Sequence, residues 1–251
     1  MKTAILITAR LGSSRLPQKH LLPVNGQPII KVLIDRIAEQ FRDELSEGSA
    51  SIVIATSDEP ENREFERFAD EYTKVFYGSR DNIPMPHLQA LRSLEFDNAL
   101  SIDGDDVLCS PQGMRKIYEA LERKMAYVVT FGLPFGMNSG GYSLDFLKRS
   151  LVDYEESMLE TGWGRIFSKL DLTEIPLTGA LVDNRLRFTL DYKQDYLFFK
   201  EIIESYEDNL ITATDEQIIE FTLSNELYRL NQDVSEQYWA NFADGIQKEQ
   251  H

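Results

Sequence analysis

Short apolar runs alternate with segments of helical spacing through the first half of this 251-residue chain. The predicted strands lie at residues 4–8, 51–56, 75–77, 99–102 and 127–131. Between them, apolar residues recur at helical intervals at 29–41, 61–72, 87–94 and 111–125. Near-continuous apolar strands that alternate with helices are typical of a mostly parallel sheet with helices on both faces. The pattern therefore predicts an α/β protein with three layers, α/β/α.

The second half of the chain departs from this alternation. Residues 133–185 are rich in glycine and their strands look short, which indicates an inserted, irregular α+β segment rather than a second domain. Residues 186–190 (LRFTL) predict a strand that returns to the main sheet. Helices are expected after it, at 194–206, 215–227 and 235–247. We expect residues 1–251 to form a single domain that carries the insert.

The chain is strongly acidic, with a formal net charge of -16. Binding along a nucleic acid or an anionic membrane needs a cationic face, so neither partner is predicted. No apolar run is long enough to cross a bilayer, and we expect a cytoplasmic protein. The single cysteine, Cys109, cannot form an internal disulfide bond and fits a reducing compartment. A protein of this charge that handles phosphates needs a few local cations or a metal ion.

The loop after the first predicted strand concentrates positive charge. It carries Arg10, Arg15 and Lys19 together with the small residues Gly12 and Ser13. Small residues let backbone N–H groups approach a ligand, and guanidinium groups pair well with phosphate oxygens, so the loop suits a polyphosphate. The chain has no Walker A sequence and no GxGxxG after a strand, so neither a P-loop nor a dinucleotide site of that type is supported.

Carboxylates follow two of the predicted strands. Asp103, Asp105 and Asp106 come directly after residues 99–102, and Asp191 follows the LRFTL run. In open parallel sheets, ligands bind beyond the carboxyl ends of the strands, where such side chains meet. Clustered carboxylates repel one another unless a cation is near, and Mg²⁺ takes one or two carboxylates plus phosphate oxygens. Asp105 and Asp191 are therefore candidate metal ligands, although any one aspartate could instead cap the following helix.

The first loop resembles the amino-terminal signature of the cytidylyltransferases that activate acidic and cell-surface sugars. This group includes CMP-KDO synthetases, CMP-acylneuraminate synthetases and the spore-coat-polysaccharide-biosynthesis type. The family pattern is close to A-R-x-G-S-[ST]-R-L-P-x-K, which the chain matches from Ala9 through Lys19, with Gln18 where glycine is usual. The segments IVIATSD, SIDGDDVLCSP and LRFTLDYKQDY follow in the family's order, and the likeness is closest to the spore-coat type.

This resemblance implies a Rossmann-like sheet of the nucleotide-diphospho-sugar transferase type, a small inserted dimerisation sub-structure and a homodimer. It also implies transfer of CMP from CTP to a sugar acid or a related cell-surface-glycan precursor, with Mg²⁺ as cofactor and pyrophosphate as product. Lys19, Arg10 and Asp105 would be catalytic, and Asp105 and Asp191 would hold the metal ion. The implied nucleotide-binding residues are Ala9, Arg10, Leu11, Gly12, Ser13, Arg15, Lys19, Thr56, Ser57, Asp58, Asp103 and Gly104.

Two departures from the family pattern keep alternatives open. Val107 stands where proline is usual, and residues 78–91 lack the D-V-L-x-R sequence common in the spore-coat branch. They motivate a catalytically inactive nucleotide-binding homologue as one alternative. The other is a metal-dependent nucleotide-sugar glycosyltransferase, because Asp103-Gly104-Asp105 fits the D-x-D pattern of such enzymes. The basic loop argues against it, since a diphosphate donor needs less cationic cover.

Overall fold

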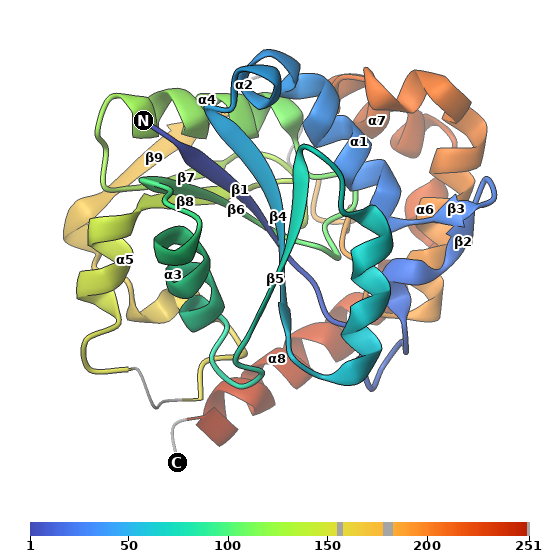
Figure 1. Ribbon diagram of the computed structural model, residues 1–251. Coiled ribbons are helices and arrows are strands. Elements are labelled where there is room, and N and C mark those ends of the chain that lie inside the picture. The colour runs from blue at the N-terminus through green and yellow to red at the C-terminus, as the bar shows by residue number, and fades with distance from the viewer. Residues whose placement is uncertain (155–157, 178–182, 250–251) are drawn as a thin grey trace.

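A seven-stranded sheet forms the centre of the molecule, of which the computed structural model describes residues 1–154, 158–177 and 183–249 (Figure 1). Its strands are β1 (Thr3–Thr8), β4 (Ala50–Ser57), β5 (Thr73–Gly78), β6 (Asn98–Asp103), β7 (Tyr127–Phe131), β8 (Gly140–Ser143) and β9 (Leu172–Pro176). They lie in the order β5-β4-β1-β6-β8-β7-β9. Neighbouring strands are parallel except at β8, which is antiparallel to both β6 and β7. The predicted mostly parallel sheet is confirmed.

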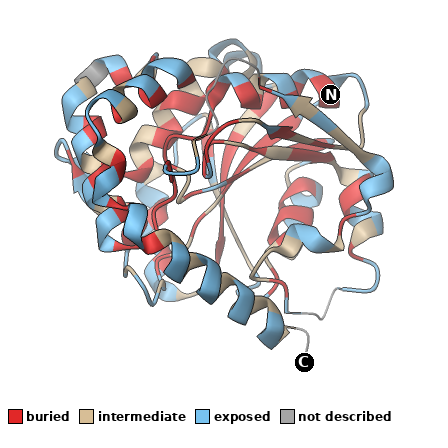
Figure 2. Cartoon of the chain, turned by 180° about the vertical axis from the view of Figure 1, so that it is seen from behind, coloured by how far each residue is buried: buried red, intermediate tan, exposed pale blue. Residues whose placement is uncertain are grey.

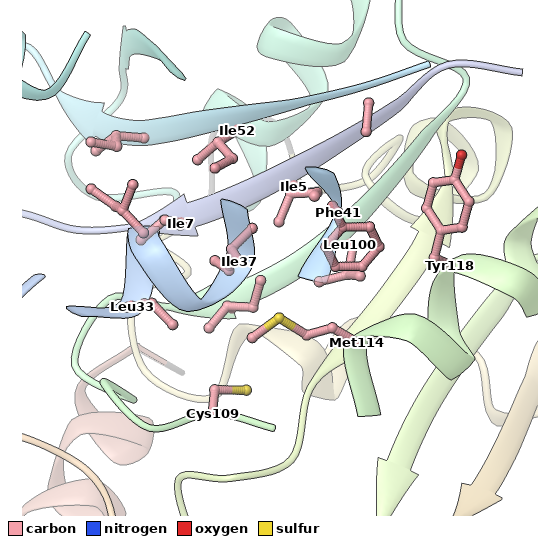
Figure 3. Close-up of a cluster of buried hydrophobic side chains, with 14 of the residues drawn as sticks. Ile5, Ile7, Leu33, Ile37, Phe41, Ile52, Leu100, Cys109, Met114 and Tyr118 are labelled. Atoms are coloured by element: carbon pink, nitrogen blue, oxygen red, sulfur yellow. The ribbon is translucent and has the colours of Figure 1, made fainter. Parts of the chain in front are cut away.

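Helices cover both faces of this sheet, as predicted for a three-layer α/β/α protein. One face carries α1 (Ile30–Gln40), α2 (Arg42–Glu47) and α4 (Pro111–Glu122); the other carries α3 (Pro84–Ser93) and α5 (Leu144–Ser150). Alternate residues of β1 point into the two layers. Ile5 and Ile7 pack into the first (Figure 3), whereas Ala4 and Leu6 pack into the second. Each fully buried large apolar side chain stabilises the fold by roughly 1.5–3 kcal/mol.

The C-terminal third adds three helices: α6 (Lys193–Tyr206), α7 (Asp215–Ser224) and α8 (Ser235–Glu249). α7 begins at a capping box in which Thr214 and Gln217 satisfy each other's backbone N–H groups. A small hairpin, β2 (Pro23–Val24) and β3 (Gln27–Pro28), precedes α1. In the described chain no helix is long and apolar enough to cross a membrane. Short 3₁₀ helices complete the fold: η1 (Lys19–Leu21), η2 (Pro60–Phe68), η3 (Trp163–Ile166), η4 (Lys169–Asp171), η5 (Glu207–Ile211), η6 (Leu227–Leu230) and η7 (Gln232–Val234).

Residues 186–190 do not form the predicted strand. Within the described chain, their β pairing is limited to one bridge, between Phe135 and Arg187. The place beside β6 is taken by β8, a glycine-containing strand that gives little β signal in sequence. A Cβ on Gly141 of β8 would lie 2.5 Å from Ile117 of α4, so glycine is required there. The apolar side chains of 186–190 pack against α6 and α7 instead.

Two other segments differ in detail from their predicted form. Residues 61–72 were expected to be helical, and the structure has the 3₁₀ helix η2 there, ending at Phe68. The helix expected at 215–227 ends at Ser224. Within 133–185, β8 and β9 pair in the main sheet, so this stretch supplies two of the seven strands.

The C-terminal helix α8 lies across the end of the sheet at which β1, β4 and β6 finish (Figure 1). None of its residues is buried. Seen from behind, the strands are largely buried whereas α8 is a ribbon of exposed and intermediate residues (Figure 2). α8 therefore rests on the molecule without entering its core.

Candidate active site

A cavity of about 950 Å³ opens at the carboxyl ends of β1, β4 and β6. The loop after β1 forms one wall, and the ends of β4 and β6 form the floor. Residues of α8 and of 158–164 form the opposite wall. This is the edge of a parallel sheet at which ligands bind in such folds.

Most of the residues singled out in the sequence meet in this cavity. Its lining includes Ala9, Arg10, Gly12, Ser13, Arg15, Lys19, Thr56, Ser57, Asp103 and Asp105. Leu11 is buried instead, and its backbone N–H donates to Oδ1 of Asn62 at 2.9 Å. Asp58 is exposed and Gly104 is buried, and neither lines the cavity. Asp191 lies just behind the wall, with 2% of its surface exposed.

Lys19 joins the two candidate metal ligands. Its Nζ donates to Oδ2 of Asp105 at 2.6 Å and to Oδ1 of Asp191 at 3.1 Å. Burial alone would lower the pKa of Lys19, but the two carboxylates outweigh it and raise that pKa, so the ammonium stays charged. Burial would raise the pKa of Asp105, yet Lys19 brings it below its usual value. The preceding residue, Gln18, has the left-handed conformation (φ 54°) that favours glycine, which is the family's usual residue there.

Asp191 is the centre of a buried charge network. Its Oδ1 also accepts from Arg15 at 2.6 Å, and its Oδ2 accepts from Arg187 at 3.0 Å. Behind it, Asp195 accepts the backbone N–H groups of Asp191 and Tyr192 at 3.0 and 2.9 Å and pairs with Arg187 at 3.1 Å. Asp195 is fully buried. It therefore fixes both the start of α6 and the orientation of the Asp191 carboxylate.

Asp103 faces the cavity from the end of β6. The residue is exposed to the solvent of the cavity, and its carboxyl group lies close to Asp105. Partial desolvation by the neighbouring protein, together with the negative charge of Asp105, raises the pKa of Asp103 to about 7. The ammonium of Lys19 opposes that shift without cancelling it.

Arg10 reaches across the cavity to the opposite wall. Its guanidinium pairs with Glu160. The backbone N–H of Glu160 donates in turn to Oε1 of Glu249 at the end of α8, at 3.0 Å. At the other end of α8, the ring of Tyr238 stacks on the guanidinium of Arg187, with 4.2 Å between Cζ of Arg187 and the ring centroid. The loop after β1 (residues 9–19, called the phosphate loop below), the 158–164 segment and α8 are therefore linked by charged contacts.

Two buried histidines support the site without carrying charge. Burial, and then the neighbouring Lys19, lowers the pKa of His20 to about 3. Burial also lowers the pKa of His87 to about 3. His87 bonds to Thr8 Oγ1 at 2.9 Å and to the Tyr142 hydroxyl at 2.6 Å, which ties α3 to the end of β1 and to β8.

The structure adds functional candidates that the sequence did not single out. Asn62 holds the loop after β1 through Leu11 and donates to Ser57 Oγ at 2.9 Å. Arg187, Asp195 and Glu160 orient charged groups of the site, as described above. Asp195 did carry a signal, since it ends the late LRFTLDYKQD element, but Asn62 and Glu160 have no local motif.

Asp105 and Asp191 can hold a divalent cation only if a bound ligand supplies further oxygen atoms. In the part of the chain that the structure describes, no three histidine, cysteine or carboxylate side chains form a metal cluster. The carboxylates of Asp105 and Asp191 do lie close together, because both contact the ammonium of Lys19. Two carboxylates with the remaining positions left to phosphate oxygens and water is a donor set that suits Mg²⁺.

Proteins of similar sequence include the following two. An uncharacterized protein of Methanocaldococcus jannaschii is 25% identical over 241 residues, covering 93% of this chain and 96% of that protein. The 8-amino-3,8-dideoxy-manno-octulosonate cytidylyltransferase of Shewanella frigidimarina is 34% identical over 128 residues. That second match spans 49% of this chain and 49% of the relative, so about half of the enzyme's length is compared.

A solved structure and a family model place the chain more firmly. A cytidylyltransferase from Leptospira borgpetersenii shares the fold with a TM-score of 0.73 at 21% identity, covering 92% of this chain and 98% of that one. The cytidylyltransferase family model matches residues 4–162, which is more than half of the chain and includes the phosphate loop and the β6 aspartates. The chain therefore belongs to the cytidylyltransferase family of nucleotidyltransferases.

Proposed function

We propose that this protein transfers CMP from CTP to a sugar acid or a related precursor of a cell-surface glycan and releases pyrophosphate. The observation that carries the proposal is the meeting of Arg10, Arg15 and Lys19 with the carboxylates of Asp105 and Asp191 at one edge of a parallel sheet. The family and the name of the Shewanella relative support CTP and a sugar acid as substrates.

In the proposed reaction an oxygen of the acceptor attacks the α-phosphorus of CTP. The new O–P bond forms as the bond from the α-phosphorus to the oxygen that bridges to the β-phosphate breaks. That electron pair leaves with pyrophosphate, and the proton of the attacking hydroxyl is released to solvent. Arg10, Arg15 and Lys19 stabilise the charge that develops on the leaving group. Ala9, Gly12 and Ser13 bring backbone close to the phosphates. Positioning and electrostatics carry the reaction, so no nucleophile on the protein is required.

Mg²⁺ is the proposed cofactor, held by Asp105 and Asp191. When bound, it neutralises phosphate charge and aligns the reactants. The charged groups of the cavity support a role for a metal ion. The described lining has five cationic side chains and six carboxyl groups. The cations are Arg10, Arg15, Lys19, Arg80 and Lys248, and the carboxyl groups are Asp103, Asp105, Asp106, Glu160, Asp244 and Glu249. The carboxyl groups offset much of the charge of the cations, so an added cation helps to neutralise a bound triphosphate.

Pyrophosphate release tests the proposal. The purified protein is given Mg²⁺, each of the four ribonucleoside triphosphates in turn, and a panel of sugar acids and sugar phosphates. Release is expected with CTP and at least one acceptor, and the product is identified by mass spectrometry. Asp105→Asn should lower turnover about a thousandfold, because it weakens the metal site. Asp171→Asn, on the exposed surface, serves as the control.

Failure of CTP to bind in calorimetry, together with silence across the panel, would overturn the proposal. Tight binding of CTP without turnover on any acceptor would identify an inactive homologue instead.

We further propose that residues 1–251 form one nucleotidyltransferase domain and that the protein acts as a homodimer. β9 is an edge strand of the sheet, and the apolar side chains of Leu170 and Phe131 beside it are 98% and 47% exposed. Such an edge invites pairing with another chain. Sedimentation that shows only monomers at micromolar concentration would refute the dimer.

A further inference from the structure

A second, smaller cavity adjoins the large one. It has a volume of about 330 Å³ and lies against β6, β7 and β8. The two cavities share four lining residues: Asp103, Asp106, Trp163 and Gly164. Its size is at the lower end of small-molecule pockets, roughly 300–1,000 Å³. A ligand that reacts in the large cavity can therefore extend into the small one past these shared residues.

Aromatic rings form much of the wall of the small cavity. Tyr127, Tyr142, Trp163 and Phe167 all line it. Trp163 meets Phe167 edge-on with 5.5 Å between ring centroids, and Phe167 meets Tyr142 similarly at 5.6 Å. These edge-to-face contacts hold the rings in place and leave a rigid apolar surface. Such a surface suits the C–H face of a sugar ring.

The polar groups of the small cavity are hydroxyls, an amide and two carboxylates. They belong to Ser101, Thr130, Ser139, Asn138, Asp103 and Asp106, and the hydroxyls of Tyr127 and Tyr142 add to them. No lysine, arginine or histidine is found among the described residues that line it. A carboxylate or phosphate entering this space would lose its hydration and gain no cationic partner. Hydroxyl and amino groups can instead donate hydrogen bonds to those carboxylates.

We propose that the small cavity holds the end of the acceptor sugar that is distal to the attacking oxygen, and that it selects an end with hydroxyl or amino groups over one with a carboxylate. This inference rests on the proposed function, because it places the acceptor beside the nucleotide. A carboxylate adjacent to the attacking oxygen is compatible with it, since that group stays in the large cavity with the cations of the phosphate loop.

Gly164 offers a way to change the charge of the small cavity without disturbing its walls. It lines both cavities, and a Cβ built on it meets no atom within 4 Å. Gly164→Lys therefore adds a cation where none exists, and Gly164→Gln adds a side chain of similar length without charge.

The test uses Trp163 as a reporter. The chain has two tryptophans, and Trp239 lines neither cavity, so Trp239→Phe leaves Trp163 as the sole tryptophan, which is excited selectively at a wavelength that tyrosine does not absorb. Three probes differ only at the carbon distal to the anomeric oxygen: D-glucose, 6-amino-6-deoxy-D-glucose and D-glucuronate. Each is titrated with and without CTP and Mg²⁺. The first two should change the Trp163 emission with apparent Kd values at least about tenfold lower than that of glucuronate.

Gly164→Lys, in the same background, should tighten glucuronate binding by at least about tenfold, and Gly164→Gln should not. Glucuronate binding as tightly as glucose before any charge is added would overturn the inference. So would an unchanged Trp163 emission with all three sugars. Calorimetry with CTP alone reports separately on the proposed function: a protein that binds sugars here but never CTP would refute that function and leave the sugar selectivity in place.

Discussion

Lys19 is the residue on which the electrostatics of the site depend most. It is 7% exposed and is the shared partner of Asp105 and Asp191. Breaking a buried ion pair by removing one partner leaves the other charge without compensation. Arg15 and Arg187 still pair with Asp191 when Lys19 is gone, whereas no other ion pair to Asp105 is found among the described residues. Most of the cost therefore arises at Asp105.

Lys19→Met should lower the free energy of unfolding by about 3 kcal/mol, because it leaves Asp105 uncompensated. The double variant Lys19→Met with Asp105→Asn should regain more than half of that loss, since both the charge and its partner are then absent. Urea unfolding of the two single variants and the double variant measures the coupling. Additive losses would show that Lys19 stabilises the fold in some other way.

His87 should make stability depend on pH in a defined direction. Its folded pKa of about 3 is below the unfolded value of 6.5, so its contribution is complete above pH 6.5 and is lost as the pH falls toward 3. The loss approaches about 1.4 kcal/mol per pH unit for this one group. His87→Gln can keep both hydrogen bonds but takes up no proton. Urea unfolding at about pH 7.5 and about pH 5 should show a smaller difference for the variant than for the wild type.

His20 shifts in the same direction, so the variant should keep part of the acid dependence. Asp103 acts in the opposite sense: its raised pKa makes stability fall as the pH rises from about 4 to 7. Both contributions cancel when the variant is compared with the wild type. An unchanged pH dependence in His87→Gln would show that the pKa of His87 is the same in the folded and the unfolded protein.

Single residues of the site could be predicted where charge and small residues cluster in a short loop. Arg10, Arg15 and Lys19 belong to one such loop, and the structure brings them to the cavity. Glu160 and Asn62 could not be predicted, because each meets the loop only through the tertiary fold, at sequence separations of 150 and 51 residues. Local sequence carries no information on such pairs.

Among the elements, α8 has the least expected role. The sequence predicts a helix at 235–247, and the structure has it at Ser235–Glu249. Its amphipathic pattern does not reveal that it forms a wall of the cavity. Two glycines let α8 pack closely against residues 158–164. The backbone of Gly245 lies against the side chain of Thr161, and the side chain of Phe242 lies against the backbone of Gly162, whose φ is 57°. α8 is therefore positioned by small residues more than by burial.

Gly245→Ala tests this seating. A Cβ at Gly245 would lie 2.7 Å from Thr161 Oγ1 and 3.1 Å from Thr161 Cγ2, so either the Thr161 side chain or α8 must shift. The alanine itself favours helix by about 1 kcal/mol, but overpacking costs typically 1–3 kcal/mol. We expect a net loss of stability of up to about 2 kcal/mol and a red shift of Trp239 emission as α8 moves away. Gly164→Ala, with open space at its Cβ, is the control, and a more stable Gly245→Ala would contradict the close packing.

The elements that could be predicted are those whose apolar pattern is local and continuous. β1, β4 and β6 are such strands, and their order along the chain with α1, α3 and α4 follows the alternation. β8 was missed because two of its four residues are glycine, and residues 186–190 were misassigned because an alternating buried segment can pack on helices as well as in a sheet. Which strand lies beside β6 is decided by long-range packing.

At the scale of the whole molecule, a net charge of -16 works against binding a polyanion. At low ionic strength the repulsion reaches roughly 30 Å from the surface, whereas at physiological salt it is screened within about 8 Å. The cavity reverses this field only weakly, because its carboxyl groups offset much of the charge of its cations. Approach of CTP therefore depends on screening by salt and on the charge of an accompanying metal ion.

Removal of Mg²⁺ should consequently abolish most of the stabilisation that CTP gives to the fold. A ligand present at about one hundred times its Kd stabilises the folded state by about 2.7 kcal/mol. We expect that gain, measured by urea unfolding, with CTP and Mg²⁺ together, and less than about 0.5 kcal/mol with the same CTP in EDTA. Mg²⁺ alone is the control for separate binding at the carboxylates, and Asp105→Asn should remove the dependence on the metal. Equal stabilisation with and without Mg²⁺ would mean that Arg10, Arg15 and Lys19 hold the triphosphate unaided, and that Asp105 and Asp191 serve only to orient Lys19.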